Sequence, residues 1–127
     1  MFLKGNYVCF LQDAEKHIGN ISNFKNNLIK SKLYKIKGDL MIDEGFFLES
    51  IDTYLKANQS YYDKKTFSGL VFYKISQAYF LDFNKNGTLK SLDNADTYIN
   101  KSLKCEIGNS AILEAIKILA ARINHEI

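Results

Sequence analysis

The chain has 127 residues, of which 46% are hydrophobic, with nine phenylalanines, eight tyrosines and a formal net charge of +3. This length suits one domain, and the apolar content is high enough for a packed core, which excludes an intrinsically disordered chain. The 17 basic side chains are nearly balanced by 14 acidic ones, so the charge does not predict a nucleic-acid-binding protein.

Two further absences in the sequence bear on where the protein works. No segment approaches the roughly 20 apolar residues of a transmembrane helix, and the stretch MFLKGNYVCFLQ lacks a secretory cleavage site. Cys9 and Cys105 belong to no CxxC or Cys/His cluster, so two reduced thiols are expected. We therefore expect a cytoplasmic protein that makes no contact with a membrane. A composition rich in Lys, Asn and Ile would suit an AT-rich bacterial genome.

Hydrophobic residues recur at helical spacing along most of the chain, and the alternation typical of strands is scarce. Residues 2–11 and roughly 13–27 predict a first helix pair, although Gly19 weakens its second helix. The stretch KSKLYKIKGDLMIDEG predicts a helix that ends at Gly45, a suitable residue for the C′ position. Its expected apolar stripe consists of Leu33, Ile36, Leu40 and Met41.

Four more amphipathic stretches follow, joined by short turns, and they predict antiparallel helix pairs. FFLESIDTYLKANQSYY brings together Phe47, Ile51, Tyr54 and Leu55. TFSGLVFYKISQAYFLDF is apolar around much of its circumference, with Leu70, Phe72, Ile75, Ala78, Tyr79 and Phe83. Ser91 can cap a helix that carries Ala95, Tyr98, Ile99, Ser102 and Leu103. The last stretch, NSAILEAIKILAARINHEI, can be capped by Asn109 or Ser110 and carries Ile112, Ala115, Ile116, Leu119 and Ile123.

Small and large side chains recur in the middle of the chain in the order of a 34-residue helix–turn–helix template. Between Ser31 and Lys64 these residues are Tyr34, Gly38, Met41, Ser50, Tyr54 and Ala57. A second unit begins at Gly69 and contains Phe72, Ile75, Ser76, Tyr79, Ala95, Ile99 and Ser102, with an expected loop insertion at 82–91. The segment 31–104 resembles tetratricopeptide repeats. It departs from the pattern at Lys37, where leucine is usual, and at Tyr62, where proline is usual.

The resemblance implies an all-α fold, a short α-solenoid of antiparallel helix pairs in a single domain. Residues 1–30 would form a degenerate first pair, 31–64 and 69–104 the two repeats, and 110–126 a C-terminal capping helix. The small residues would let paired helices approach to about 8–10 Å, with larger ones filling the space beside them. An irregular helical-repeat fold of another lineage is the alternative.

The stretch DFNKNGTLKSLD, residues 82–93, matches the calcium-loop pattern at Asp82, Asn84, Asn86, Gly87 and Asp93. A turn between helices is the preferred interpretation, because asparagine and glycine favour turns and Asp replaces the usual bidentate Glu at the last position. Lys90 adds a positive charge, and the chain has no second loop of this kind. Because the turn is the preferred interpretation, no metal or cofactor is expected. Weak calcium binding through this loop stays the alternative.

Catalytic machinery is not evident. His17 and His125 lie near opposite ends of the chain and in no metalloprotease motif, and no phosphate-binding loop or nucleophile elbow is present. We therefore expect a protein that is not an enzyme.

What remains is a binding surface on the inner face that the resemblance assigns to the first helix of each repeat. Its residues would be Lys32, Lys35, Asp39, Ile42, Leu70, Tyr73, Gln77 and Phe80. With Tyr73 and Phe80 as anchors, this groove predicts an adaptor or chaperone that binds a protein or peptide. The carboxylate clamp of heat-shock co-chaperones is disfavoured, because Asp39 and Leu70 stand where Asn and Lys are needed. Alternatives are a receptor similar to peptide-pheromone receptors, a toxin-neutralising protein, and a structural subunit that self-associates as a homodimer.

Overall fold

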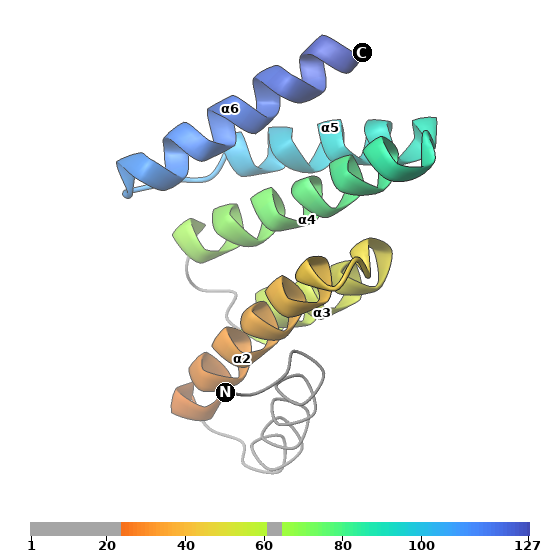
Figure 1. Cartoon of the computed structure of the whole chain (residues 1–127). Coiled ribbons are helices and arrows are strands. Elements are labelled where there is room, and N and C mark those ends of the chain that lie inside the picture. Colours follow the sequence, from red (N-terminus) through yellow and green to blue (C-terminus); the bar gives the residue numbers. More distant parts are fainter. Residues whose placement is uncertain (1–23, 61–64) are drawn as a thin grey trace. The chain divides into compact units, whose positions relative to one another are not determined.

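The computed structural model describes residues 24–60 and 65–127. Over these residues the protein is all-helical, as predicted, and it contains no strand there (Figure 1). The helices are α2 (Phe24–Asp43), α3 (Phe47–Ser60), α4 (Lys65–Asn86), α5 (Leu89–Leu103) and α6 (Ser110–Glu126). The chain divides into two compact units, residues 1–61 and 62–127.

One expected boundary is corrected at α2. Residues 24–30, which were expected to belong to a separate first pair, are continuous with this helix. The remainder of the expected first pair lies outside the described residues.

In the first unit, α2 and α3 form a hairpin whose turn is set by Gly45. This glycine has φ +87°, a backbone conformation that is energetically less favourable for residues with a side chain. Its N–H donates to the carbonyl of Ile42 at 2.9 Å, and the N–H of Phe46 donates to the carbonyl of Met41 at 2.9 Å. This pair of bonds is a Schellman motif, which satisfies carbonyls that the helix end leaves without a partner. The predicted role of Gly45 as the helix stop is confirmed.

The two helices of this hairpin meet through small residues, as expected. A Cβ placed on Gly38 would lie 2.7 Å from Cε1 of Tyr54, so the tyrosine ring occupies the space that a larger residue would need. Ser50, Tyr54 and Ala57 on α3 are fully buried. The expected apolar stripe on α2 is wrong at Ile36, which is 38% exposed, whereas Tyr34 is buried. The buried face of α2 is thus the face that carries Tyr34 and Gly38.

In the second unit, α4 and α5 form a longer hairpin with a two-residue connection, Gly87 and Thr88. The expected loop over residues 82–91 is therefore wrong, because all of it is helical except that connection. Gly87 has φ +69°, and its N–H donates to the carbonyl of Phe83 at 2.7 Å, which ends α4. The residues that this unit has beyond the 34-residue template therefore lie in the two helices, and the turn between them stays short.

Two serine hydroxyls join α4 to α5. Ser76 donates to the carbonyl of Ala95 at 2.7 Å, and Ser102 donates to the carbonyl of Gly69 at 2.6 Å. All four residues are buried. These bonds satisfy hydroxyls that would otherwise be costly to bury, and they need the close helix approach that small residues allow.

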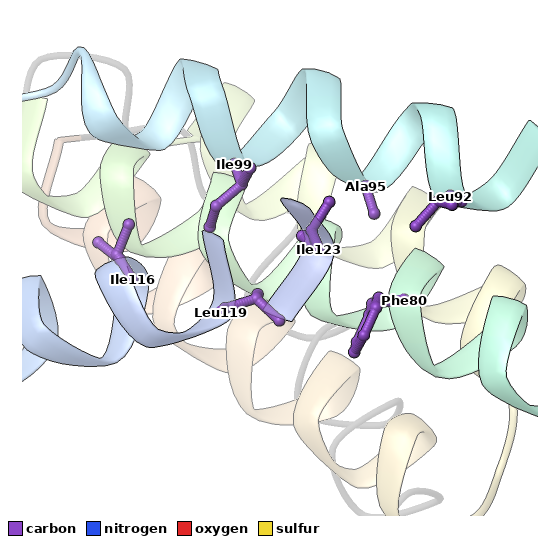
Figure 2. Close-up of a cluster of buried hydrophobic side chains, with 7 residues drawn as sticks. All are labelled: Phe80, Leu92, Ala95, Ile99, Ile116, Leu119 and Ile123. Carbon is purple, nitrogen blue, oxygen red and sulfur yellow. The ribbon is translucent and has the colours of Figure 1, made fainter. Parts of the chain in front are cut away.

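The helix α6 packs on this hairpin. Its N-cap is Asn109, whose side-chain oxygen accepts from the N–H of Ile112 at 3.1 Å. Asn109 is one of the two residues that were predicted as the cap. Figure 2 shows the core that α4, α5 and α6 share. Its buried members are Phe80, Leu92, Ala95, Ile99, Ile116, Leu119 and Ile123. Among the helices described, none has the length and apolar character needed to cross a membrane.

Candidate functional site

The residues predicted to line an inner face fall into two sets, one in each unit. In the first unit, Lys32 is exposed and Ile42 is half-buried. Lys35 and Asp39 form an ion pair, with 3.0 Å between Nζ and Oδ2. The other carboxylate oxygen of Asp39 accepts from the Tyr54 hydroxyl at 2.5 Å. Asp39 is therefore held within its own unit by Lys35 and by Tyr54, and the bond to Tyr54 anchors it to α3.

The Tyr54 hydroxyl is held in its neutral form. Burial, the hydrogen bond to Asp39 and the negative charges of Asp39 and Asp43 together raise its pKa far above the usual value of about 10. The carboxylate of Asp39 thus orders the interior of the hairpin, in addition to any role at the surface.

In the second unit, the predicted anchor Phe80 is only 4% exposed and belongs to the shared core. This corrects the expectation that Phe80 is a free anchor: α6 packs over it, and its ring forms the floor of a depression. Tyr73 and Gln77 are half-buried and lie beside it at the same depression. Leu70 is half-buried but does not line it.

Two adjoining depressions lie between α4 and α6, and together they form what is called here the α4–α6 groove. They share Phe80 and Arg122. The smaller one has a volume of about 190 Å³ and is lined by Tyr73, Gln77, Phe80, Leu81, Ala115, Ile118, Leu119 and Arg122. The larger one has a volume of about 320 Å³ and is lined by Phe80, Asn84, Ala121, Arg122, His125 and Glu126.

Arg122 is the central polar group of this groove. Its guanidinium lies 5.3 Å from the centre of the Phe80 ring, a cation–π contact. It is also close enough to Tyr73 to oppose, in part, the effect of burial, which raises the pKa of that phenol. Within the described part of the chain, no carboxylate lies within ion-pair distance of Arg122.

An apolar side chain at the edge of the groove is unusually exposed. Ile118 lies one helical turn before Arg122 on α6 and is 54% exposed, whereas Ile116 and Leu119 beside it are buried. Sequence reasoning did not single out either Ile118 or Arg122 as a site residue. A signal existed for Ile118, because it lies off the apolar stripe that the rest of α6 follows. The face of α6 that covers α4 could not be read from the sequence.

Residues 82–93 do not have the geometry that the calcium-loop hypothesis requires. Asp82, Asn84 and Asn86 lie within the last turns of α4, and Asp93 is exposed on α5. The Asp82 carboxylate is buried and accepts from Ser91 Oγ at 2.5 Å and from Asn86 Nδ2 at 2.8 Å. A helix does not wrap these residues around an ion as a loop does. The prediction that Ser91 is the N-cap of α5 is wrong, because Thr88 holds that position. Ser91 instead joins α5 to α4 through its bond to Asp82.

Other reactive side chains are dispersed. Among residues 24–60 and 65–127, no three His, Cys, Asp or Glu side chains gather where they could hold a metal ion. Cys105 is half-buried and unbridged, and its thiol donates to the carbonyl of Lys101 at 3.4 Å. His125 is exposed at the larger depression. Cys9 and His17 lie outside the described residues.

No protein-family model, curated protein or solved structure matches the chain.

Proposed function

We propose that this chain is a non-enzymatic adaptor or chaperone that binds a segment of another protein in the α4–α6 groove. The observation that carries the proposal is the exposure of Ile118 beside an aromatic floor formed by Tyr73 and Phe80. Apolar side chains of this size stabilise a protein when they are covered, by about 1.5–3 kcal/mol for full burial. Aromatic residues and arginine are also the types enriched where proteins bind one another.

The dimensions of the groove favour a protein segment over a small molecule. Small-molecule sites usually enclose about 300–1,000 Å³ and bury most of the ligand. The smaller depression lies below this range and the larger one at its lower end, and exposed residues of α6 form their rims. Two shallow depressions side by side are suited to successive side chains of an extended or helical segment.

We also propose that the helix pairs stack as a short tetratricopeptide-like solenoid. The support is local: the small residues of both hairpins are buried at the predicted positions, and each hairpin is closed by a short turn. In such an array α6 is the capping helix, and the groove that it forms with α4 lies on the first helix of the second repeat.

The test is a selection of peptides from a displayed library with the full-length chain as bait. The affinities of the selected peptides are then measured by titration calorimetry against three variants. Ile118→Asp and Tyr73→Ala change the groove, and Leu89→Asp is the matched control, because Leu89 is 70% exposed and lies outside the groove.

Loss of binding by at least tenfold with the two groove variants, and retention with Leu89→Asp, is the expected result. Circular dichroism confirms that each variant keeps its helices. Phe80→Ala is not suitable for this purpose, because Phe80 is a core residue and its removal costs about 3–5 kcal/mol of stability. Peptides that bind all variants equally well would show that the groove is not the binding surface.

A further inference from the structure

The charge distribution within the α4–α6 groove restricts the chemistry of its partner. Of the eight residues that line the smaller depression, only Arg122 is charged. The others are aromatic, aliphatic or, at Gln77, neutral and polar. The larger depression also contains His125 and the acid Glu126, and Glu126 lies one turn after Arg122 on α6 without reaching ion-pair distance of it. Among the described residues, Arg122 has no carboxylate within ion-pair distance, and at the smaller depression its neighbours are uncharged. There it gains most from a partner that supplies an anionic group.

The position of the guanidinium strengthens this point. It lies over the Phe80 ring, and this contact helps to hold it in the groove. A guanidinium that is already positioned loses less conformational freedom on binding than a mobile side chain. The guanidinium carbon lies 5.3 Å from the ring centre, and the N–H groups remain able to donate to a carboxylate, often through two parallel bonds.

The spacing along α6 then sets the pattern of the partner. Ile118 and Arg122 are separated by one helical turn and lie on the same face of the helix. A partner helix alongside would present an apolar residue to Ile118 and an acidic residue one turn away to Arg122.

Resting on the proposed function, we propose that the occupant of the α4–α6 groove is an amphipathic helical segment of another protein. Its binding face has a large apolar side chain and, three or four residues away, an Asp or Glu that pairs with Arg122.

The experiment compares displayed libraries of amphipathic helical peptides selected on the wild-type chain and on two charge variants, Arg122→Gln and Arg122→Glu. Arg122 is exposed, so both variants should fold, which circular dichroism checks. Lys117→Gln is the matched control, since Lys117 is an exposed cation on the same helix but outside the groove. The wild type and the control should enrich Asp or Glu three or four residues from an apolar anchor.

The variants should change this preference in a defined direction. With Arg122→Gln the acidic preference disappears while the apolar anchor remains, and with Arg122→Glu it changes to Lys or Arg. Peptides selected on the wild type should bind Arg122→Gln at least tenfold more weakly, and higher salt should reduce this difference.

Two results would overturn the inference. Selected peptides that need Ile118 but show no acidic preference would exclude the pairing with Arg122 and leave the groove as a binding surface. A dimer in light scattering that Ile118→Asp dissociates would identify a second copy as the occupant. Peptides that bind regardless of Ile118 would instead contradict the proposed function itself.

Discussion

The Ser76 hydroxyl on α4 donates a 2.7 Å hydrogen bond to the backbone carbonyl of Ala95 on α5, and both residues are fully buried. This bond joins the two helices of the hairpin inside the protein. The hydroxyl therefore marks the point where a small side chain is needed for packing and where its polar atom must also be satisfied.

Ser76→Ala should lower the free energy of unfolding by about 1 kcal/mol, because it removes one buried hydrogen bond. Ser76→Leu should cost more, about 1–3 kcal/mol, because the larger side chain must separate α4 from α5. Urea denaturation followed by circular dichroism measures both. Thr97→Ala is the control: the Thr97 hydroxyl bonds to the carbonyl of Asp93 at an exposed site, and its loss should cost less than about 0.5 kcal/mol. Equal effects of Ser76→Ala and Thr97→Ala would contradict the role given to Ser76.

Gly38→Ala should destabilise the α2–α3 hairpin by about 1–3 kcal/mol, although alanine is the better helix former. The reason is the Tyr54 ring, which lies 2.7 Å from the added Cβ and is fixed by its bond to Asp39. Thermal unfolding of the variant measures the loss. Gly108→Ala should show no such loss, because the space around Gly108 is open. A stabilised Gly38→Ala protein would show that the two helices are not in close contact there.

Asp82→Ala should lower stability by about 1–3 kcal/mol, because it removes the acceptor of two hydrogen bonds and leaves the Ser91 hydroxyl buried without this partner. Asp93→Ala should have little effect, because Asp93 is exposed.

We also expect the melting temperature of the wild-type chain to be the same with and without millimolar Ca²⁺, since the Asp82 carboxylate is already hydrogen-bonded inside the fold. A rise with calcium that Asp82→Ala abolishes would restore the metal-site hypothesis.

Tyr54→Phe should change how stability depends on pH. The pKa of Tyr54 is raised in the folded protein, so in the unfolded chain the phenol loses its proton first, near pH 10. The contribution of the Tyr54 hydroxyl is therefore complete below about pH 10 and is lost as the pH rises further. The difference in unfolding free energy between the wild type and Tyr54→Phe should stay constant from pH 6 to about 9 and shrink above about pH 10. A difference that grows with pH would contradict this assignment.

The local features of the fold were predictable because each depends on a few neighbouring residues. Gly45 marks a helix end through its backbone freedom, and Asn109 caps α6 through its short polar side chain. The same reasoning failed at residues 82–91, where Asn and Gly suggested a long turn. Asp82 instead bonds to Ser91 across the hairpin, so a contact between two helices keeps this stretch helical almost to its end.

The candidate site was predictable only in part, because it depends on how separate helices meet. Tyr73 and Gln77 were predicted as binding residues and do line the groove. Phe80 was predicted to be accessible, but α6 covers it. Ile118 and Arg122 were not identified, since their role depends on the angle at which α6 crosses α4, and helical periodicity does not specify that angle.

Phe80 belongs both to the core and to the floor of the groove, and this limits how the shape of the groove can change. A substitution that reshapes the floor also weakens the fold, whereas Ile118 and Arg122 can vary at little cost to stability because both are exposed. If the groove binds a partner as proposed, new specificities should arise through the exposed residues of α6, while the floor stays nearly constant.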